Sequence, residues 1–178
     1  MKNILNFLLF QLTWFVSVWS IGQEIPYWGL LFVAGVLVFH LGWIATNRLE
    51  ELNLIFKVVL LGGVVETLFS SLGLVSFVYA SDYFPTYPPY MWGIWANFAM
   101  TFHFSMKWLE KRIFLAAGMG GVAGPLAYFA AEKLGAIDVQ WNTYLDLAGL
   151  VVIWSLTMLI IVQFLMSNSK GPFNACQS

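Results

Sequence analysis

The sequence contains little charge and almost no cysteine. Only 10% of its 178 residues are charged, 60% are hydrophobic and the mean hydropathy is +0.78, whereas roughly 25% of the residues of a soluble domain are charged. The single cysteine, Cys176, excludes an intrachain disulfide and a cysteine metal cluster. A net charge of −1 provides no basic surface for nucleic acid. A soluble or nucleic-acid-binding protein is therefore excluded, and we expect no metal site.

Long apolar runs fill most of the chain. A helix needs about 20 apolar residues to cross a hydrocarbon core of ~30 Å. Six runs reach this length and predict an all-α integral membrane fold, a six-helix transmembrane bundle in one domain of residues 1–178: 4–22, 27–46, 54–73, 89–110, 113–136 and 143–167. The first run ends in Ser20-Ile21-Gly22, which imitates a signal-peptide cleavage site, but its length favours a retained helix.

The basic residues are distributed unequally between the two sides of this predicted bundle. Lys133 alone lies on one side, and the other side holds the remaining seven of the eight Lys and Arg residues: Lys2, Arg48, Lys57, Lys107, Lys111, Arg112 and Lys170. Because basic loops remain in the cytoplasm, we expect both termini to be cytoplasmic. Residues 47–51 are expected to form a charged loop on that inner side.

Glu66 is the ionisable residue that lies most deeply inside a predicted span. A charged group at this depth is costly, and for that reason it marks a candidate functional site. Its neighbours at helical spacing are small: Gly62, Ser70 and Gly73. This face is therefore expected to pack against another helix rather than lipid. Gly120 and Gly124 predict a second close helix contact, which includes a proline bend at Pro125.

Counting 1.5 Å per residue from the inner end of each run sorts the polar residues into two layers. The outer layer, roughly 18–22 Å from the inner face, contains Glu66, Asn97 and Tyr128. The inner layer, roughly 10 Å from that face, contains Gln11, His40 and His103. Asn97 is the predicted partner of Glu66. We predict that Glu66 and His103 are catalytic, and that the substrate contacts Asn97, Tyr128, Gln11 and His40.

The same residues also support other interpretations. The polar layers are also explained by hydrogen bonds that only fix the helix register. His40 and His103 at matching depth suggest a haem held from both faces, although no cofactor is predicted otherwise. The segment from Tyr79 to Trp92 is rich in aromatic residues and favours an interfacial belt or a headgroup-binding lid. Two tryptophans near mid-span are expected to line an aromatic or polyene pocket: Trp14 and Trp154.

The order of several short motifs resembles one known family. The motifs are Leu5-Asn6-Phe7, Phe10-Gln11, Trp14-Phe15, Gly63-Val64-Val65-Glu66, Leu72-Gly73-Leu74, Phe102-His103-Phe104-Ser105, Lys107-Trp108-Leu109 and Gly124-Pro125-Leu126-Ala127-Tyr128. Together they resemble domain-of-unknown-function family 2878, a family of small bacterial inner-membrane proteins. The resemblance implies a bacterial inner-membrane location and, from neighbouring genes, a link to membrane fatty-acid modification. This family often has aspartate at the position of Glu66 and asparagine at that of Phe102.

Three functional classes follow from these features. The first is an enzyme or accessory protein of membrane lipid modification, with its polar site around Glu66. The second is a small carrier or channel that uses Glu66 as its proton site. The third is a structural partner for another membrane protein or for a second copy of the chain. Tyr87-Pro88-Pro89-Tyr90-Met91-Trp92 also resembles a loop of small tryptophan-rich porphyrin-binding membrane proteins, but that class has five helices.

Overall fold

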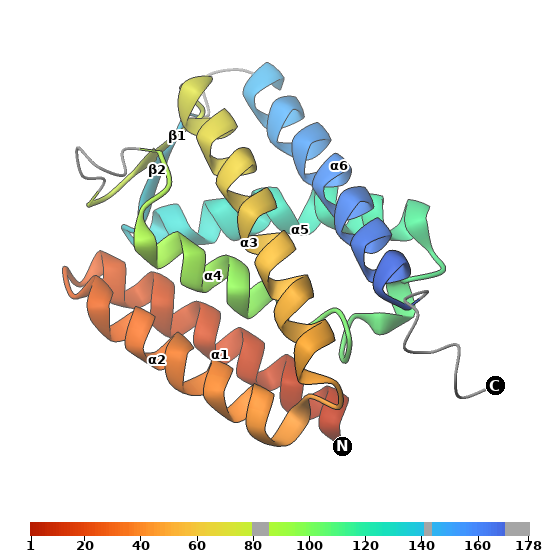
Figure 1. Cartoon of the computed structure of the whole chain (residues 1–178). Coiled ribbons are helices and arrows are strands. Elements are labelled where there is room, and N and C mark those ends of the chain that lie inside the picture. The colour runs from red at the N-terminus through yellow and green to blue at the C-terminus, as the bar shows by residue number, and fades with distance from the viewer. Residues whose placement is uncertain (80–85, 141–143, 170–178) are drawn as a thin grey trace.

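The computed structural model describes residues 1–79, 86–140 and 144–169 (Figure 1). Within these residues, five helices are long and apolar enough to cross a membrane: α1 (Lys2–Gly22), α2 (Pro26–Phe39) with its π-helical extension η1 (His40–Ile44), α3 (Arg48–Ser71), α5 (Ile113–Lys133) and α6 (Tyr144–Ser169). The shorter elements are β1 (Val75–Phe77), α4 (Pro89–Ala99), the 3₁₀ helix η2 (Lys107–Leu109) and β2 (Ile137–Val139). The chain is therefore a mostly helical, multi-pass membrane protein.

The prediction of a full-length helix over residues 89–110 is wrong. α4 ends at Ala99, and its 11 residues cover only about 16 Å at 1.5 Å per residue. Asn6 Nδ2 donates to Met100 O at 2.9 Å, and Thr101 Oγ1 donates to Phe98 O at 2.7 Å. These polar side chains satisfy carbonyl groups at the helix end, so the backbone can leave the helix while it remains buried in protein.

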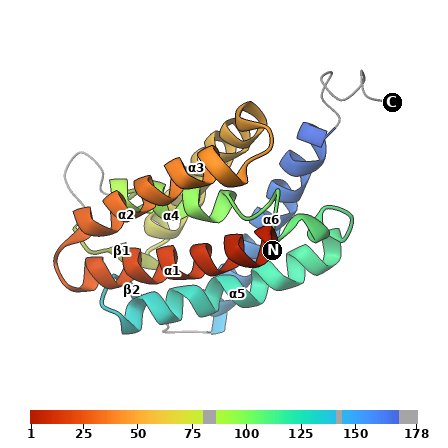
Figure 2. The same cartoon turned by 90° about the horizontal axis from the view of Figure 1, so that it is seen from below.

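The helices pack as two pairs around α4. α1 packs against α2, and α5 packs against α6, while α3 contacts both α4 and α6 (Figure 1). α4 contacts α1, α2 and α3, and seven of its 11 residues are buried, so it is the interior helix of the molecule. Seen from below, α5 lies on the side of α1 opposite α2 and α3 (Figure 2).

α3 and α5 end in the same way. Each is followed by a Leu-Gly pair, and Gly73 and Gly135 have φ angles of 70° and 75°. The amide after each glycine bonds to the carbonyl five residues earlier, which is the Schellman cap that favours glycine. The chain then enters β1 and β2, which pair antiparallel with Phe77 opposite Ile137. This two-stranded sheet joins the ends of α3 and α5.

Glycines bring α5 and α6 into close contact. A Cβ atom on Gly124 would lie 2.2 Å from Cγ of Trp154, and one on Gly120 would lie 2.4 Å from Cγ of Met158. The predicted close packing at these glycines is therefore confirmed. Pro125 lies inside α5 without ending it.

Some predictions fall outside the described residues: the centre of the aromatic segment at 80–85, and the tail with Lys170 and Cys176. The described part of the aromatic segment is anchored to the protein. Tyr87 Oη donates to Val59 O at 2.9 Å, and Tyr90 Oη donates to Val78 O at 2.6 Å. Burial raises the pKa of the Tyr87 phenol, which therefore stays a neutral donor.

Candidate functional site

Glu66 lies at the centre of the molecule and is 1% exposed. Tyr128 Oη, from α5, lies 2.7 Å from Oε1 and 2.6 Å from Oε2 of the carboxyl group and donates to it. Trp95 Nε1, from α4, donates to Oε1 at 2.9 Å. Three helices thus meet at one carboxyl group. Both donors are uncharged at neutral pH, so their dipoles stabilise this group.

Glycine positions the tryptophan that binds Glu66. Gly62 lies one turn before Glu66 on α3, and a Cβ atom there would lie 2.3 Å from the indole ring of Trp95. The small-residue face predicted around Glu66 therefore packs against a neighbouring helix at Gly62, as expected. The prediction is wrong for Gly73, which lies beyond the end of α3 and is exposed. Trp95 in turn stacks on Trp154 of α6, with ring centroids 5.4 Å apart and an interplanar angle of 1°. Gly124 makes room for Trp154 in the way that Gly62 does for Trp95.

A cavity of about 490 Å³ borders Glu66 and this aromatic cluster. Ligand pockets typically have volumes of about 300–1,000 Å³. α1, α4 and α5 enclose most of the cavity, which extends from Phe77 and Ile137 of the sheet to Met106 in the turn after α4. Trp14 and Trp154 both line it, as predicted. Among the described residues around the cavity, Glu66 is the only Asp or Glu, and none is Lys, Arg or His.

The cavity reaches the surface of the molecule between α1 and α5. The described lining residues that are exposed lie on these two helices: Phe7 and Gln11 of α1, and Ala123 and Leu126 of α5. Phe7 is 43% and Leu126 is 60% exposed. These two helices begin at the same end of the molecule and run side by side (Figure 2). They meet at their other end, where Gly22 lies against Leu134 O. Because exposed apolar residues on spanning helices face lipid, this opening is expected to face the hydrocarbon.

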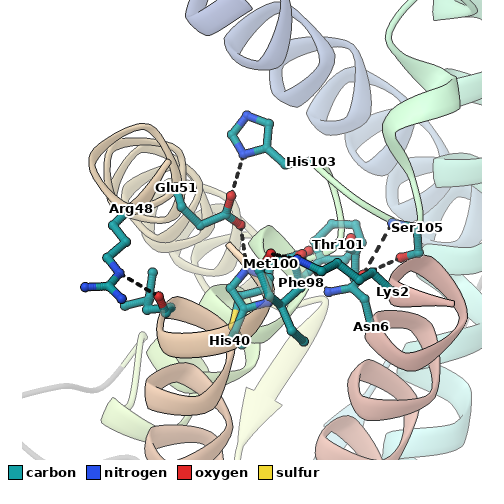
Figure 3. A network of polar contacts seen from close by, with 12 residues as sticks. Lys2, Asn6, His40, Arg48, Glu51, Phe98, Met100, Thr101, His103 and Ser105 are labelled. Atoms are coloured by element: carbon teal, nitrogen blue, oxygen red, sulfur yellow. Dashed lines mark hydrogen bonds and ion pairs between the residues drawn. The ribbon is translucent and has the colours of Figure 1, made fainter. Parts of the chain in front are cut away.

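A second carboxyl group brings together two of the predicted site residues. Glu51, 2% exposed, lies between His40 and His103 (Figure 3). His40 Nε2 is 2.8 Å from Oε1, and His103 Nδ1 is 2.6 Å from Oε2. His40 is almost fully buried, whereas the side chain of His103 is 18% exposed. The two histidines predicted at matching depth are therefore adjacent, but the group between them is a carboxylate.

Irregular backbone brings the two imidazoles to Glu51. His40 starts the π-helical turn η1, where its carbonyl accepts from Ala45 N at 2.8 Å. His103 lies in the turned segment after α4. Arg48 Nε donates to Leu41 O at 2.9 Å and ties the start of α3 to η1. π-Helical turns are rare and often occur at functional sites.

The prediction that Glu51 lies in a charged loop is wrong. The side chain of Asn47 accepts a hydrogen bond from Glu50 N, so α3 starts at Arg48, earlier than its apolar run. The signal that would have identified Glu51 is helical spacing. Stepping back along α3 from Glu66 through Gly62, Val58 and Ile55 arrives at Glu51, and all five positions are buried.

The structure separates residues that depth alone had grouped. Glu66 and Tyr128 meet as their shared layer predicted, but the expected Glu66–Asn97 pair is wrong, because Asn97 Nδ2 donates to Phe10 O at 3.1 Å. Two residues along α4 differ by about 200° in direction, so Asn97 and Trp95 cannot both face Glu66. Gln11 lines the cavity and is not part of the histidine cluster. Nothing in the sequence singled out Trp95 as a donor to Glu66.

The histidine cluster does not fit the bis-histidine haem hypothesis. An iron atom would have to lie between the two ring nitrogens, and the Glu51 carboxylate lies there instead. Glu66 and His103 also belong to separate clusters, so the structure does not form an acid–base pair from them. Within residues 1–79, 86–140 and 144–169, no group of three or more His, Cys, Asp or Glu side chains is placed to bind a metal ion.

Comparison with known proteins agrees with the resemblance in the motifs. No curated protein and no solved structure matches the chain. The model of the family described as "Protein of unknown function (DUF2878)" matches residues 3–160. Because this match covers nearly the whole sequence, the chain belongs to that family.

Proposed function

We propose that this protein binds a lipid-like molecule in the cavity and that Glu66 and Tyr128 form the polar end of the binding site. The observation that carries this proposal is a buried carboxyl group on the wall of an otherwise apolar cavity of about 490 Å³. Pockets for small ligands are mostly apolar and contain a few convergent polar groups. A molecule with a long apolar part matches this lining.

The opening between α1 and α5 supports a ligand that arrives from the membrane. Phe7 and Leu126 at this opening are apolar and exposed, so a molecule dissolved in the bilayer reaches the cavity without crossing water. A water-soluble substrate would have to cross this apolar surface. The cavity therefore favours a lipid-like ligand over a polar metabolite.

The chemistry available at the polar end is proton transfer. A carboxyl group exchanges a proton with a bound group that lies within hydrogen-bonding reach, and Tyr128 fixes its orientation. This arrangement suits an enzyme or accessory protein of lipid modification, with Glu66 as general acid or base. In this proposal His40 and His103 stabilise the fold through Glu51 and do not take part in the reaction.

Lipid analysis of cavity variants tests the binding proposal. Ala123 lines the cavity, so Ala123→Phe fills it, whereas the neighbouring Val122 is 63% exposed and does not line the cavity, so Val122→Phe is the matched control. Mass spectrometry of purified protein is expected to find a lipid-like molecule with the wild type and Val122→Phe and not with Ala123→Phe. Equal amounts of the same lipid in all three proteins would contradict the proposal.

The role in lipid modification has its own test in cells. Glu66→Gln is expected to change the fatty-acid profile of a strain that depends on this protein, because the amide cannot exchange a proton as the acid does. His103→Ala is the comparison variant, since it removes an imidazole of the other cluster. If Glu66→Gln leaves the profile as in wild type, the modification role is wrong, whereas binding in the cavity is tested separately.

The second candidate function is a proton-coupled carrier. It is favoured by the position of Glu66 beside a cavity, since an intramembrane carboxyl group next to a substrate space is typical of proton-coupled transport. Purified protein in vesicles would then move protons together with a lipid-like substrate, and Glu66→Gln would abolish this flux. Absence of flux alongside a changed fatty-acid profile would favour the enzyme over the carrier.

We also propose the orientation and location of the protein. The excess of basic residues at one side supports cytoplasmic termini, and the family resemblance supports the bacterial inner membrane. Protease accessibility of a tag at either terminus, in inverted and right-side-out vesicles, tests the orientation.

A further inference from the structure

We propose that the occupant of the cavity is one acyl chain of an intact phospholipid, whose phosphate group remains outside at the basic ends of α1 and α5. This inference rests on the proposed binding function and names its ligand class. It follows from two features of the cavity: its lining contains one acid and no base among the described residues, and its opening lies between two helices that both begin with basic residues.

The lining of the cavity excludes an anionic headgroup from its interior. A carboxylate or phosphate inside an apolar cavity needs a cation or several donors to offset its desolvation. The described lining offers neither Lys, Arg nor His, and Glu66 would repel a second negative charge. Trp95 Nε1 and Tyr128 Oη already bind Glu66, and Tyr90 Oη donates to Val78 O. The remaining donor side chains of the lining are neutral, namely Gln11, Trp14 and Trp154, and supply no positive charge. The part of the ligand inside the cavity is therefore uncharged.

Basic residues lie at the matching end of both helices that border the opening. Lys2 is the first residue of α1, and Lys111 and Arg112 directly precede α5. All three are exposed, although Lys2 Nζ also donates to Ile44 O of η1 at 3.4 Å, and Figure 2 shows that α1 and α5 begin at the same end. Basic residues at the membrane surface attract anionic headgroups, each by about 1 kcal/mol. A phosphate is therefore favoured at this end.

The spacing between these charges and the cavity fits a lipid. Phe7, the first residue of α1 that lines the cavity, lies five positions after Lys2, and Met119 lies six positions after Ile113 at the start of α5. At 1.5 Å per residue these steps are roughly 8–9 Å. A headgroup at the basic ends thus places its acyl chain at the opening one or two helical turns deeper. The chain then runs along α5 toward Tyr128 and Glu66.

Photochemical labelling tests this assignment. Nanodiscs are prepared with a phosphatidylglycerol that has a diazirine near the middle of one acyl chain, and labelled peptides are identified after irradiation. Diazirines label carboxyl groups efficiently, so Glu66 is expected to be labelled. Glu51 is the internal control, because it is a buried acid of the same helix that does not line the cavity and should remain unlabelled. Ala123→Phe should abolish the label on Glu66.

Charge variants separate the headgroup from the chain. The triple variant Lys2→Gln, Lys111→Gln and Arg112→Gln is expected to lower phospholipid labelling of Glu66 at least about fivefold, which is the change that loss of a single contact of about 1 kcal/mol produces. Labelling by a neutral diazirine fatty alcohol should stay unchanged. Lys133→Gln is the matched control, because Lys133 is exposed at the opposite end of α5 and should leave both labels unchanged.

The outcomes distinguish this inference from the function on which it rests. If the fatty alcohol or a free fatty acid labels Glu66 and the phospholipid does not, the phospholipid assignment is wrong and binding of a lipid-like molecule stands. If the triple variant changes neither label, the basic ends do not bind the phosphate and the assignment is overturned. If none of these probes labels Glu66, the proposed function fails as well.

Discussion

Two buried glutamates of α3, Glu51 and Glu66, differ in their hydrogen-bond partners and in their position relative to the cavity. Glu51 does not line the cavity, and its partners are two histidines that lie on irregular backbone. Glu66 has a tyrosine and a tryptophan as partners, is reached through a glycine contact and lies on the cavity wall. They are 15 positions apart, roughly 22 Å along the helix. Burial alone therefore does not identify a functional acid, since what adjoins the group decides its role.

The difference in partners has an energetic meaning. A carboxylate between two imidazoles is part of an ion pair when either ring is protonated, and removal of one member leaves the other groups buried without compensation. Replacing a carboxyl group that accepts from neutral donors by another acceptor costs less stability, because the donors keep a partner. Glu51 should thus matter mainly for folding and Glu66 mainly for function. Four sets of substitutions test this contrast.

The largest expected effect is that of Glu51→Ala. It removes the acceptor that the rings of His40 and His103 share, and loss of one partner from a buried ion pair costs about 3–5 kcal/mol. Thermal unfolding in detergent, followed by helical circular dichroism, should show a much lower melting temperature. Glu50→Ala, at the less buried neighbouring position, should change stability by only about 0.5 kcal/mol. Equal effects of the two substitutions would contradict the structural role of Glu51.

Gly124→Ala should have the next largest effect and tests how the Glu66 site is built. The added methyl group would displace Trp154, and overpacking of this kind costs about 1–3 kcal/mol. Because Trp154 stacks on Trp95, the near-ultraviolet circular dichroism of the indole pair should change as well. Gly118→Ala on the same helix meets no atom within 4 Å and should be neutral or slightly stabilising. An unchanged indole signal in Gly124→Ala would argue against this packing.

His103→Ala is expected to lower the free energy of unfolding by about 1 kcal/mol. His40→Ala should lower it more, because an unsatisfied group costs more stability when it is fully buried. The side chain of His103 is 18% exposed, so water can replace it as a partner of Glu51, whereas that of His40 is 2% exposed. Melting temperatures of the two variants measure this difference. The reverse order would mean that the turned segment after α4 stabilises the cluster more than η1 does.

The smallest effect on stability is expected for Glu66→Gln, below about 1 kcal/mol. The amide oxygen still accepts from Trp95 Nε1 and Tyr128 Oη, so neither donor is left unsatisfied. Glu66→Leu removes the acceptor and should cost about 2 kcal/mol, which makes it a useful companion variant. If Glu66→Gln unfolded as readily as Glu51→Ala, both acids would be structural and the contrast between them would disappear.

The sequence predicted the parts of this molecule that depend on composition and spacing. Apolar runs located five spanning helices, and the small-residue faces at Gly62 and Gly124 correctly indicated close helix contacts. It failed where one tertiary hydrogen bond decides the outcome. The Asn6 contact at Met100 O accompanies the end of α4, and nothing local to residues 89–110 encodes a partner so far away in the chain.

The candidate site was predictable to a similar degree. Counting depth along each helix correctly placed Glu66 at the level of Tyr128, and His40 at the level of His103. It succeeded because distance along a membrane normal can be estimated from residue number. It could not distinguish directions around a helix, and so it paired Asn97 with Glu66 and overlooked Trp95. Glu51 was missed because a capping asparagine, Asn47, extends α3 into a charged segment.

Because the cavity opens toward lipid, the affinity of this protein for a ligand is measured against lipid and not against water. A ligand that enters between α1 and α5 exchanges with bulk lipid instead of water, and lipid tails are as apolar as the leucines they contact. The hydrophobic effect then contributes almost nothing to choosing one occupant over another. Selection is left to the few groups that differ from hydrocarbon: the carboxyl group of Glu66 inside the cavity and the basic residues at the starts of α1 and α5 outside it. Occupancy will follow the mole fraction of the ligand in the membrane, so a modest preference at these groups is enough to select an abundant lipid.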